Sequence, residues 1–220
     1  MRVVIAGGHG KIALLLERML TGRGDQAVAL IRNPAQADDI EQTGAVPVVL
    51  DLEAVSPADV AAVLAGTDAV VFAAGAGPGS GAARKDTVDR AASVLVAEAA
   101  GLAGVRRFVQ ISGMGVDQRP AAGTDQVWAA YLAAKAAAEE DLRARDLDWT
   151  ILRPGGLTDD KPTGKVALAP PPLPRGQVPR ADAAAVVLTL LDEPHTSHLT
   201  LDLTSGSTPV GGAAREIAHS

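Results

Sequence analysis

The chain has 220 residues, of which 47% are hydrophobic, 21% charged and 2% aromatic. This length suits one domain, and a core of Ala, Val, Leu and Ile favours helices packed on a parallel sheet over an aromatic-rich β-sandwich. The net charge of −6 carries no basic excess, which argues against a nucleic-acid surface or an anionic-membrane anchor. We therefore expect a small-molecule partner.

Cysteine and histidine usage limits the possible sites further. The chain has no cysteine, and its four histidines show no metal-ligand spacing, so neither a disulfide framework nor a bound metal is expected. The chain opens on a strand pattern with no basic region before an apolar stretch, and no apolar run is long enough to span a bilayer. The sequence therefore predicts a cytoplasmic protein.

Short apolar runs rich in Val and Ile are typical of strands that are covered on both faces. They occupy residues 3–6, 27–31, 46–50, 69–73, 107–111 and 150–152. Helical spacing of apolar residues between them predicts helices over 88–102 and 131–142. Right-handed crossovers then give an α/β Rossmann fold, a doubly wound parallel sheet in a single domain over 1–220, with ligands beyond the carboxyl ends of the strands.

Two stretches interrupt this alternation. Residues 75–81 (GAGPGSG) are expected to form a flexible loop after the fourth strand, and residues 155–180 are rich in Pro and Gly. A structureless stretch as long as the second inside a compact domain is usually functional. It is interpreted either as a substrate lid or as a plain linker.

A glycine-rich turn joins the first strand to the first helix. It consists of Gly7, Gly8, His9, Gly10, Lys11, Ile12 and Ala13. Gly7 or Gly8 permits the tight turn, Gly10 lets the backbone approach a diphosphate, and Ala13 lets the helix pack near the strand. Free N–H groups at the helix start attract phosphates, so the turn predicts a dinucleotide site. His9 and Lys11 either lie near the phosphates or are solvated loop residues.

The end of the second strand indicates which nucleotide is bound. An NAD site usually has a carboxylate there to bind the ribose 2′-hydroxyl, whereas this chain has Arg32. A guanidinium can hold a 2′-phosphate with two hydrogen bonds, so NADP(H) is favoured over NAD(H), although a surface arginine before a helix is the alternative. Asp51 closes the third strand and lies either beside the adenine or as a cap on the next helix.

Tyr131 and Lys135 are four residues apart and share one helical face. A lysine beside a tyrosine lowers the pKa of the phenol, so the pair can move a proton at a carbonyl or alcohol oxygen during hydride transfer. Ser112 follows the fifth strand and is expected at the same edge of the sheet. The alternative is an ordinary amphipathic helix edge. Trp128 is expected either to line a substrate pocket or to pack in the core.

Further short motifs extend along the chain. They are Asp51-Leu52, Ala73-Ala74-Gly75-Ala76, Leu152-Arg153-Pro154-Gly155-Gly156-Leu157 and Thr163-Gly164-Lys165-Val166. With the glycine turn, Ser112, Tyr131 and Lys135, they make the chain resemble the atypical short-chain dehydrogenase/reductase superfamily. The resemblance is to its small NAD(P)H-binding branch, which is related to NAD-dependent epimerase/dehydratases.

The resemblance implies a role for each matching residue. Ser112 would be a hydroxyl donor, Tyr131 the proton-transfer residue and Lys135 a ribose-binding cation. The cofactor would be lined by Gly7, Gly8, His9, Gly10, Lys11, Ile12, Arg32, Asp51, Leu52, Ala74, Gly75 and Pro154. Two departures are Ala13, which replaces a third glycine, and the proline-rich stretch, which stands where sugar-nucleotide enzymes have a longer extension.

The sequence thus predicts an NADP(H)-binding oxidoreductase that reduces a small carbonyl or quinone-like compound. Two alternatives remain at this point: a non-catalytic regulatory protein that senses NADPH, and a nucleotide-sugar epimerase/dehydratase.

Overall fold

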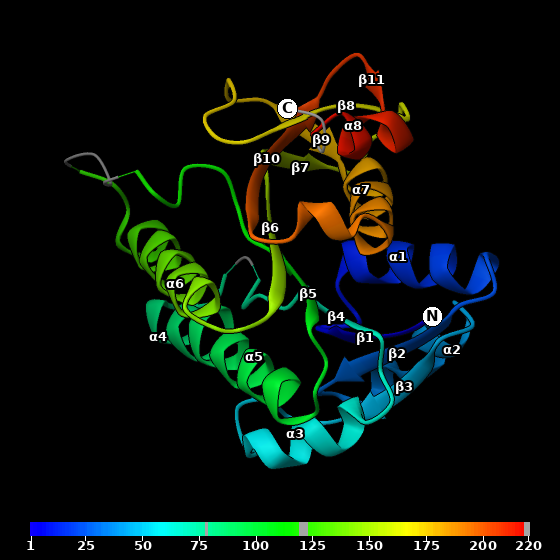
Figure 1. Cartoon of the computed structure of the whole chain (residues 1–220). Coiled ribbons are helices and arrows are strands. Elements are labelled where there is room, and N and C mark those ends of the chain that lie inside the picture. Colours follow the sequence, from blue (N-terminus) through cyan, green and yellow to red (C-terminus); the bar gives the residue numbers. More distant parts are fainter. Residues whose placement is uncertain (78, 119–122, 218–220) are drawn as a thin grey trace.

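A computed structural model describes residues 1–77, 79–118 and 123–217. Its described strands form a nine-stranded sheet, whose first six strands have the order β3-β2-β1-β4-β5-β6 and run parallel (Figure 1). They are β1 (Arg2–Ala6), β2 (Gln26–Ile31), β3 (Val46–Val49), β4 (Ala69–Phe72), β5 (Arg107–Ile111) and β6 (Asp148–Pro154). The predicted doubly wound Rossmann sheet is confirmed.

Three further strands extend the sheet beyond β6. β10 (Leu199–Ser205) pairs parallel with β6, β8 (Lys165–Ala169) pairs antiparallel with β10, and β11 (Thr208–Pro209) pairs antiparallel with β8. A separate two-stranded sheet joins β7 (Gly156–Thr158) to β9 (Gln177–Pro179).

The prediction that residues 155–180 lack regular structure is therefore wrong. The stretch contains β7, β8 and β9. Its run Val166 to Leu168 pairs with β10, and Val166 is fully buried. The density of Pro and Gly on either side conceals a short apolar run that strands of a sheet edge can bury.

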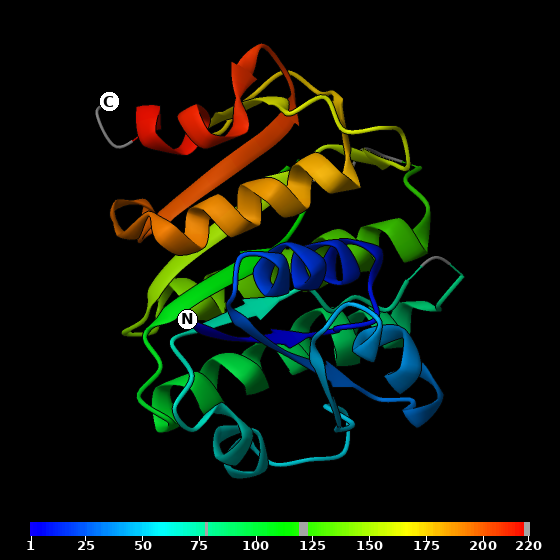
Figure 2. The same cartoon turned by 90° about the vertical axis from the view of Figure 1, so that its right-hand side faces the viewer.

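Helices cover both faces of the sheet (Figures 1 and 2). One face carries α1 (Lys11–Gly22), α7 (Arg180–Asp192) and α8 (Val210–Ile217), and the other carries α3 (Pro57–Leu64), α5 (Ala92–Leu102) and α6 (Gln126–Arg143). Alternate residues of β1 point to opposite faces of the sheet. Val3 and Ile5 pack in the core under α1 and α7, whereas Val4 and Ala6 pack in the core under α3 and α5. No helix in the described ranges is long and apolar enough to cross a bilayer.

Shorter elements connect these layers. They are η1 (Pro34–Gln36), α2 (Ala37–Glu41), α4 (Ala82–Arg84), η2 (Lys85–Ala91) and η3 (Pro194–Thr196). The helix predicted over 88–102 thus belongs to two elements, the π-helix η2 followed by the α-helix α5. Apolar spacing alone does not distinguish a short π-helix from an α-helix. π-Turns are rare and occur frequently at functional sites. The predicted helix over 131–142 lies inside α6.

One acidic side chain, Glu17, is among the buried residues of α1. Glu17 is fully buried, its Oε2 accepts a 3.1 Å hydrogen bond from the hydroxyl of Thr43, and its Oε1 has no hydrogen-bond partner. Burial raises the pKa of Glu17 to about 7, against an ordinary value of 4.5. The folded protein therefore holds this proton more tightly than the unfolded chain does.

We expect stability to depend on pH through Glu17. The stabilisation of the folded state that comes from protonated Glu17 is fully present below pH 4.5, and it is lost as the pH rises through about 7. Glu17→Gln keeps the shape without the charge, so it should raise the free energy of unfolding at pH 8 by about 3 kcal/mol or less. Urea unfolding at pH 5 and pH 8 measures this difference, with Glu98→Gln, an exposed site on α5, as the control. An equal effect of Glu17→Gln at both pH values would contradict it.

Candidate functional site

The glycine turn places backbone where side chains would not fit. Gly7 has φ +81°, and a Cβ there would lie 2.5 Å from the Cα of Ala74. A Cβ on Gly8 would lie 2.5 Å from the Cβ of Ala29, so Gly8 packs on β2 rather than facing the cleft. Gly7 thus makes the tight turn, and Gly8 allows close contact with the neighbouring strand.

Gly10 is the N-cap of α1, and no side chain caps this helix. The first N–H groups of an uncapped helix need an acceptor, and the partial positive charge of the helix start favours an anion. The diphosphate of a dinucleotide fits both requirements, because Gly10 has no side chain in its path. The predicted close packing of Ala13 is also present, since Ala13 is fully buried.

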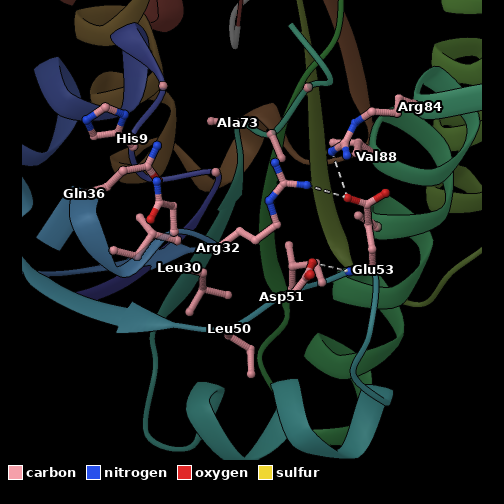
Figure 3. A pocket seen from close by; sticks show the side chains of 18 residues that line it. His9, Leu30, Arg32, Gln36, Leu50, Asp51, Glu53, Ala73, Arg84 and Val88 are labelled. Atoms are coloured by element: carbon pink, nitrogen blue, oxygen red, sulfur yellow. Dashed lines mark hydrogen bonds and ion pairs between the residues drawn. The ribbon is translucent and has the colours of Figure 1, made fainter. Parts of the chain in front are cut away.

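A cavity of about 380 Å³ lies on the β2 and β3 side of the turn (Figure 3). Its lining includes Gly7, His9, Gly10, Arg32, Asn33, Asp51, Leu52, Glu53, Ala74, Gly75 and Arg84. Eight of these were predicted to bind the cofactor: Gly7, His9, Gly10, Arg32, Asp51, Leu52, Ala74 and Gly75. An open space at the ends of these strands is where the adenosine half of a dinucleotide binds in a doubly wound sheet.

Glu53 holds two arginines in this cavity. Its Oε2 accepts hydrogen bonds from Arg32 at 3.0 Å and from Arg84 at 2.8 Å, and its Oε1 accepts one from Thr87 at 2.6 Å. Figure 3 shows both guanidinium groups turned toward this carboxylate. Arg32 is half exposed, so its charge is available to a ligand at the cavity mouth. Arg32, Arg84 and Glu53 together carry a net charge of one positive unit.

Asp51 does not cap the next helix. Its carboxylate accepts a hydrogen bond from the N–H of Glu53 at 3.1 Å, within the turn that follows β3. The cap of α3 is Ser56, which forms a capping box with Asp59. The capping alternative for Asp51 is therefore wrong, and Asp51 lines the cavity.

A second cavity, of about 920 Å³, lies on the β4 and β5 side of the turn. It shares His9, Gly10, Ala73, Ala74 and Gly75 with the first, so the two form one cleft across the carboxyl ends of the strands. The remaining lining includes Lys11, Ile12, Lys85, Asp89, Ser112, Trp128, Tyr131, Lys135, Leu157 and Arg180. All three residues of the predicted catalytic set are among them.

Tyr131 lines this second cavity and is partly buried. A Cβ on Gly113 would lie 2.9 Å from the Tyr131 hydroxyl, which places that hydroxyl beside the residue that follows Ser112. Burial raises the pKa of Tyr131 to about 12, and the nearby carboxylates of Asp89 and Glu139 raise it further toward that value. The pKa of Tyr131 is therefore raised, whereas the sequence predicted that Lys135 would lower it. At neutral pH Tyr131 holds its proton.

Lys135 is neutralised by an acid from another helix. Its Nζ lies 3.3 Å from Oδ1 of Asp89, in η2, and also donates to the carbonyl of Ile111 at 3.3 Å. Both side chains are buried, and burial lowers the pKa of Lys135 while Asp89 opposes that shift. Lys135 therefore does not present an uncompensated charge to Tyr131, whose ring centroid is 6.0 Å away.

Ser112 donates its hydroxyl proton away from the cleft. Its Oγ lies 2.6 Å from Oε1 of Glu139, which is fully buried on α6. Arg153, on β6, binds both oxygens of Glu139, at 3.0 and 2.7 Å, and Asp117 at 2.7 Å. The buried ion pair fixes Glu139, and Glu139 in turn orients Ser112.

Trp128 is not part of the core. It is 52% exposed and stacks on Tyr131 with ring centroids 5.0 Å apart and an interplanar angle of 23°. The core interpretation of this residue is therefore wrong. Trp128 gives the second cavity a flat apolar surface at its mouth.

The remaining predicted residues have other contacts. His9 binds Asp39 at 2.8 Å, and Lys11 binds Asp159 at 2.5 Å, and both also line the cleft. Pro154 is buried in β6 and, like Gly8, is not among the described residues that line either cavity. Its predicted contact with the cofactor stays a prediction.

Several residues of the site were not predicted from the sequence. They are Glu53, Lys85, Asp89, Glu139 and Arg180. Glu139 follows Lys135 by four residues, so the helical spacing that joins Tyr131 to Lys135 already placed it on the same face. Asp89 and Lys85 share such a spacing, but the loop before them gave no reason to bring them to Tyr131.

Comparison with known proteins agrees with this arrangement. A family model described as NAD(P)H-binding matches residues 7–194. A Bacillus subtilis (strain 168) protein described as an uncharacterized sugar epimerase, YhfK, is 34% identical over 218 residues, covering 99% of this chain and 100% of that protein.

Two solved structures are similar over nearly their whole length. One, from Bacillus halodurans and assigned to the NAD-dependent epimerase/dehydratases, is 34% identical with a TM-score of 0.89, over 98% of this chain and 99% of that one. The oxidoreductase ylbE of Lactococcus lactis is 25% identical with a TM-score of 0.87, over 100% and 98%. The chain belongs to the NAD(P)H-binding family, in the small epimerase/dehydratase-like branch of the atypical short-chain dehydrogenase/reductase superfamily.

Proposed function

We propose that the protein is an NADPH-dependent reductase of a small carbonyl or quinone-like compound. The observation that carries the proposal is the continuous cleft, which joins the uncapped start of α1 to the hydroxyl of Tyr131. A dinucleotide with its diphosphate at Gly10 would extend its adenosine into the first cavity and its nicotinamide into the second. The larger volume of the second cavity leaves room there for a substrate.

The preference for NADPH rests on the first cavity. Arg32 and Arg84 converge on Glu53 there, and together they can give a 2′-phosphate two guanidinium partners. Glu53 would lose its hydrogen bonds to them when the phosphate binds. The carboxylate of Glu53 could also accept a hydrogen bond from the 2′-hydroxyl of NADH. Glu53 would therefore limit how strongly the site prefers NADPH over NADH.

Tyr131 is suited to donate a proton in this reaction. When bound, NADPH supplies a hydride, that is, two electrons, to the carbonyl carbon. Tyr131 donates its hydroxyl proton to the carbonyl oxygen, which gives the alcohol, and recovers a proton from solvent. A phenol with a pKa near 12 is protonated at neutral pH, as this direction of the reaction requires. Lys135 and Ser112 hold the surroundings of Tyr131 in place through Asp89 and Glu139.

Residues 155–180 would form the outer wall of the substrate site. Leu157 and Arg180 line the second cavity. The carboxylate of Asp159 binds both Lys11, at 2.5 Å, and Arg180, at 2.7 Å, which ties the stretch to the starts of α1 and α7. This stretch would act as a substrate lid, and the ion pairs of Asp159 are one of its attachments, beside the pairing of β8 with β10.

The description of the Bacillus subtilis relative supports a second candidate, a sugar epimerase. An epimerase first oxidises its substrate, and that step needs a base. With its pKa raised to about 12, Tyr131 is almost entirely protonated at neutral pH, so little of the phenolate that would act as this base is present. The reductase is therefore the proposal that the electrostatics of the site favour.

The arginines give a test of cofactor choice. Arg32→Ala and Arg84→Ala should each weaken NADPH binding about tenfold, because each removes a partner of the 2′-phosphate, and should leave NADH binding almost unchanged. Titration calorimetry with both nucleotides measures this, and Arg18→Ala on the exposed side of α1 is the control. Equal loss of affinity for NADPH and NADH would remove the role given to the arginines.

The role of Tyr131 is tested by turnover. Tyr131→Phe should lower kcat/KM for NADPH-dependent reduction by about 100-fold or more, because the proton donor is lost, while NADPH affinity stays the same. The first probe is 9,10-phenanthrenequinone, with oxidation of NADPH followed by absorbance. An unchanged rate in Tyr131→Phe would refute the assignment. If the protein bound NADPH but no carbonyl probe caused NADPH oxidation, a sensor would be favoured. If the protein interconverted UDP-glucose and UDP-galactose, an epimerase would be favoured.

The pH dependence of reduction follows from the same residue. Since the pKa of Tyr131 is raised to about 12, its proton is present throughout the neutral and mildly alkaline range. We expect kcat/KM for reduction to stay level between about pH 7 and 9 and to fall only at higher pH. Steady-state rates in buffers of constant ionic strength measure the profile. A decline centred near pH 7 would show that a different group supplies the proton.

A further inference from the structure

A second buried lysine faces Tyr131. Lys85 is the first residue of the π-helix η2, is 8% exposed and lines the second cavity. Its Nζ lies 5.5 Å from the centroid of the Tyr131 ring and donates to the carbonyl of Gly77 at 2.9 Å. The reaction described above assigns no role to Lys85.

The other cations of this cavity have carboxylate partners. Lys135 is paired with Asp89, and Lys11 and Arg180 are both paired with Asp159. Lys85 differs, because no carboxylate oxygen in the described part of the chain lies within 4.0 Å of its Nζ. A buried ammonium without a counter-ion is costly, so an anionic ligand at this position would be stabilised.

The hydrogen bond to Gly77 does not use up the capacity of Lys85. An ammonium group has three donors, and the carbonyl of Gly77 takes one. A lysine whose only role was the hydrogen bond to Gly77 would not need to lie close to the ring of Tyr131 as well. Its place beside Tyr131 puts its remaining donors within the same cavity as the reacting group.

Another part of the lining of this cavity is flat and apolar. Trp128 stacks on Tyr131 and is half exposed, and Val127 and Leu157 also line the cavity. Such a surface suits an aromatic or conjugated ring. Tyr131 is therefore close both to an aromatic surface that suits a ring and to a cation without a carboxylate partner.

We propose that Lys85 is a substrate-binding residue and that the substrate is a planar aromatic or conjugated carbonyl compound carrying a carboxylate or a similar anionic group. The ring stacks near Trp128, and the anionic group accepts a hydrogen bond from Lys85. This deepens the proposed function and rests on it for the reaction, but the binding step is measurable without turnover.

A matched pair of ligands tests the proposal directly. 2-Naphthoate and 2-naphthamide have the same ring and nearly the same shape, and only the first is charged. Titration calorimetry with the NADP⁺-loaded protein, and with the protein free of nucleotide, should give 2-naphthoate the lower Kd, by about tenfold or more. Lys85→Met should remove this difference by weakening 2-naphthoate alone, Lys85→Arg should keep it, and Lys165→Met, on the exposed edge of β8, should not change it.

Three results would overturn the proposal: equal affinity of the native protein for the two ligands, no measurable binding of 2-naphthoate, or an equal loss of both in Lys85→Met. The last would mean that Lys85 only maintains the shape of the cavity. Failure of the proposed function is a separate observation, because a protein that oxidises no NADPH can still prefer the naphthoate through Lys85.

Discussion

The site depends on one feature, the start of α1 left without a side-chain cap at Gly10. Gly7 turns the chain sharply after β1, and Gly10 keeps the approach to the first helical N–H groups open. The helix start thus presents donors and a partial positive charge at the centre of the cleft. The two cavities meet there, so a ligand bound at this point reaches both.

The charged residues around the cleft act as pairs whose members come from different elements. Glu53 follows β3 and binds Arg32 after β2, Asp89 of η2 neutralises Lys135 of α6, and Arg153 of β6 holds Glu139. Each pair fixes the geometry of a group that would contact the ligand. The charge that a ligand meets is therefore set by these contacts rather than by the residue types that face it.

The sequence was enough to predict the core of the fold, because β1 to β6 are continuous apolar runs and the glycine turn has a steric reason. It also placed Tyr131, Lys135 and Ser112 at one edge of the sheet, through the four-residue helical spacing of the first two and the position of Ser112 after the fifth strand. It misjudged the pKa of Tyr131, because burial outweighs a lysine that Asp89, 46 positions away in sequence from Lys135, already neutralises. Strand β8 was missed, because a short strand near the end of the sheet depends on partners, here β10 and β11, that local patterns do not reveal.

The pairing of β8 limits how the substrate site can open. Because β8 is hydrogen-bonded to β10 and β11, which lie outside this stretch, residues 155–180 cannot swing away as one body without breaking strand pairs. The connection 159–164 is the part outside these ladders that also carries Asp159, and the other connection is stiffened by four prolines between 170 and 174. Opening of this wall would therefore be a local rearrangement of 159–164, in which Asp159 releases Lys11 or Arg180.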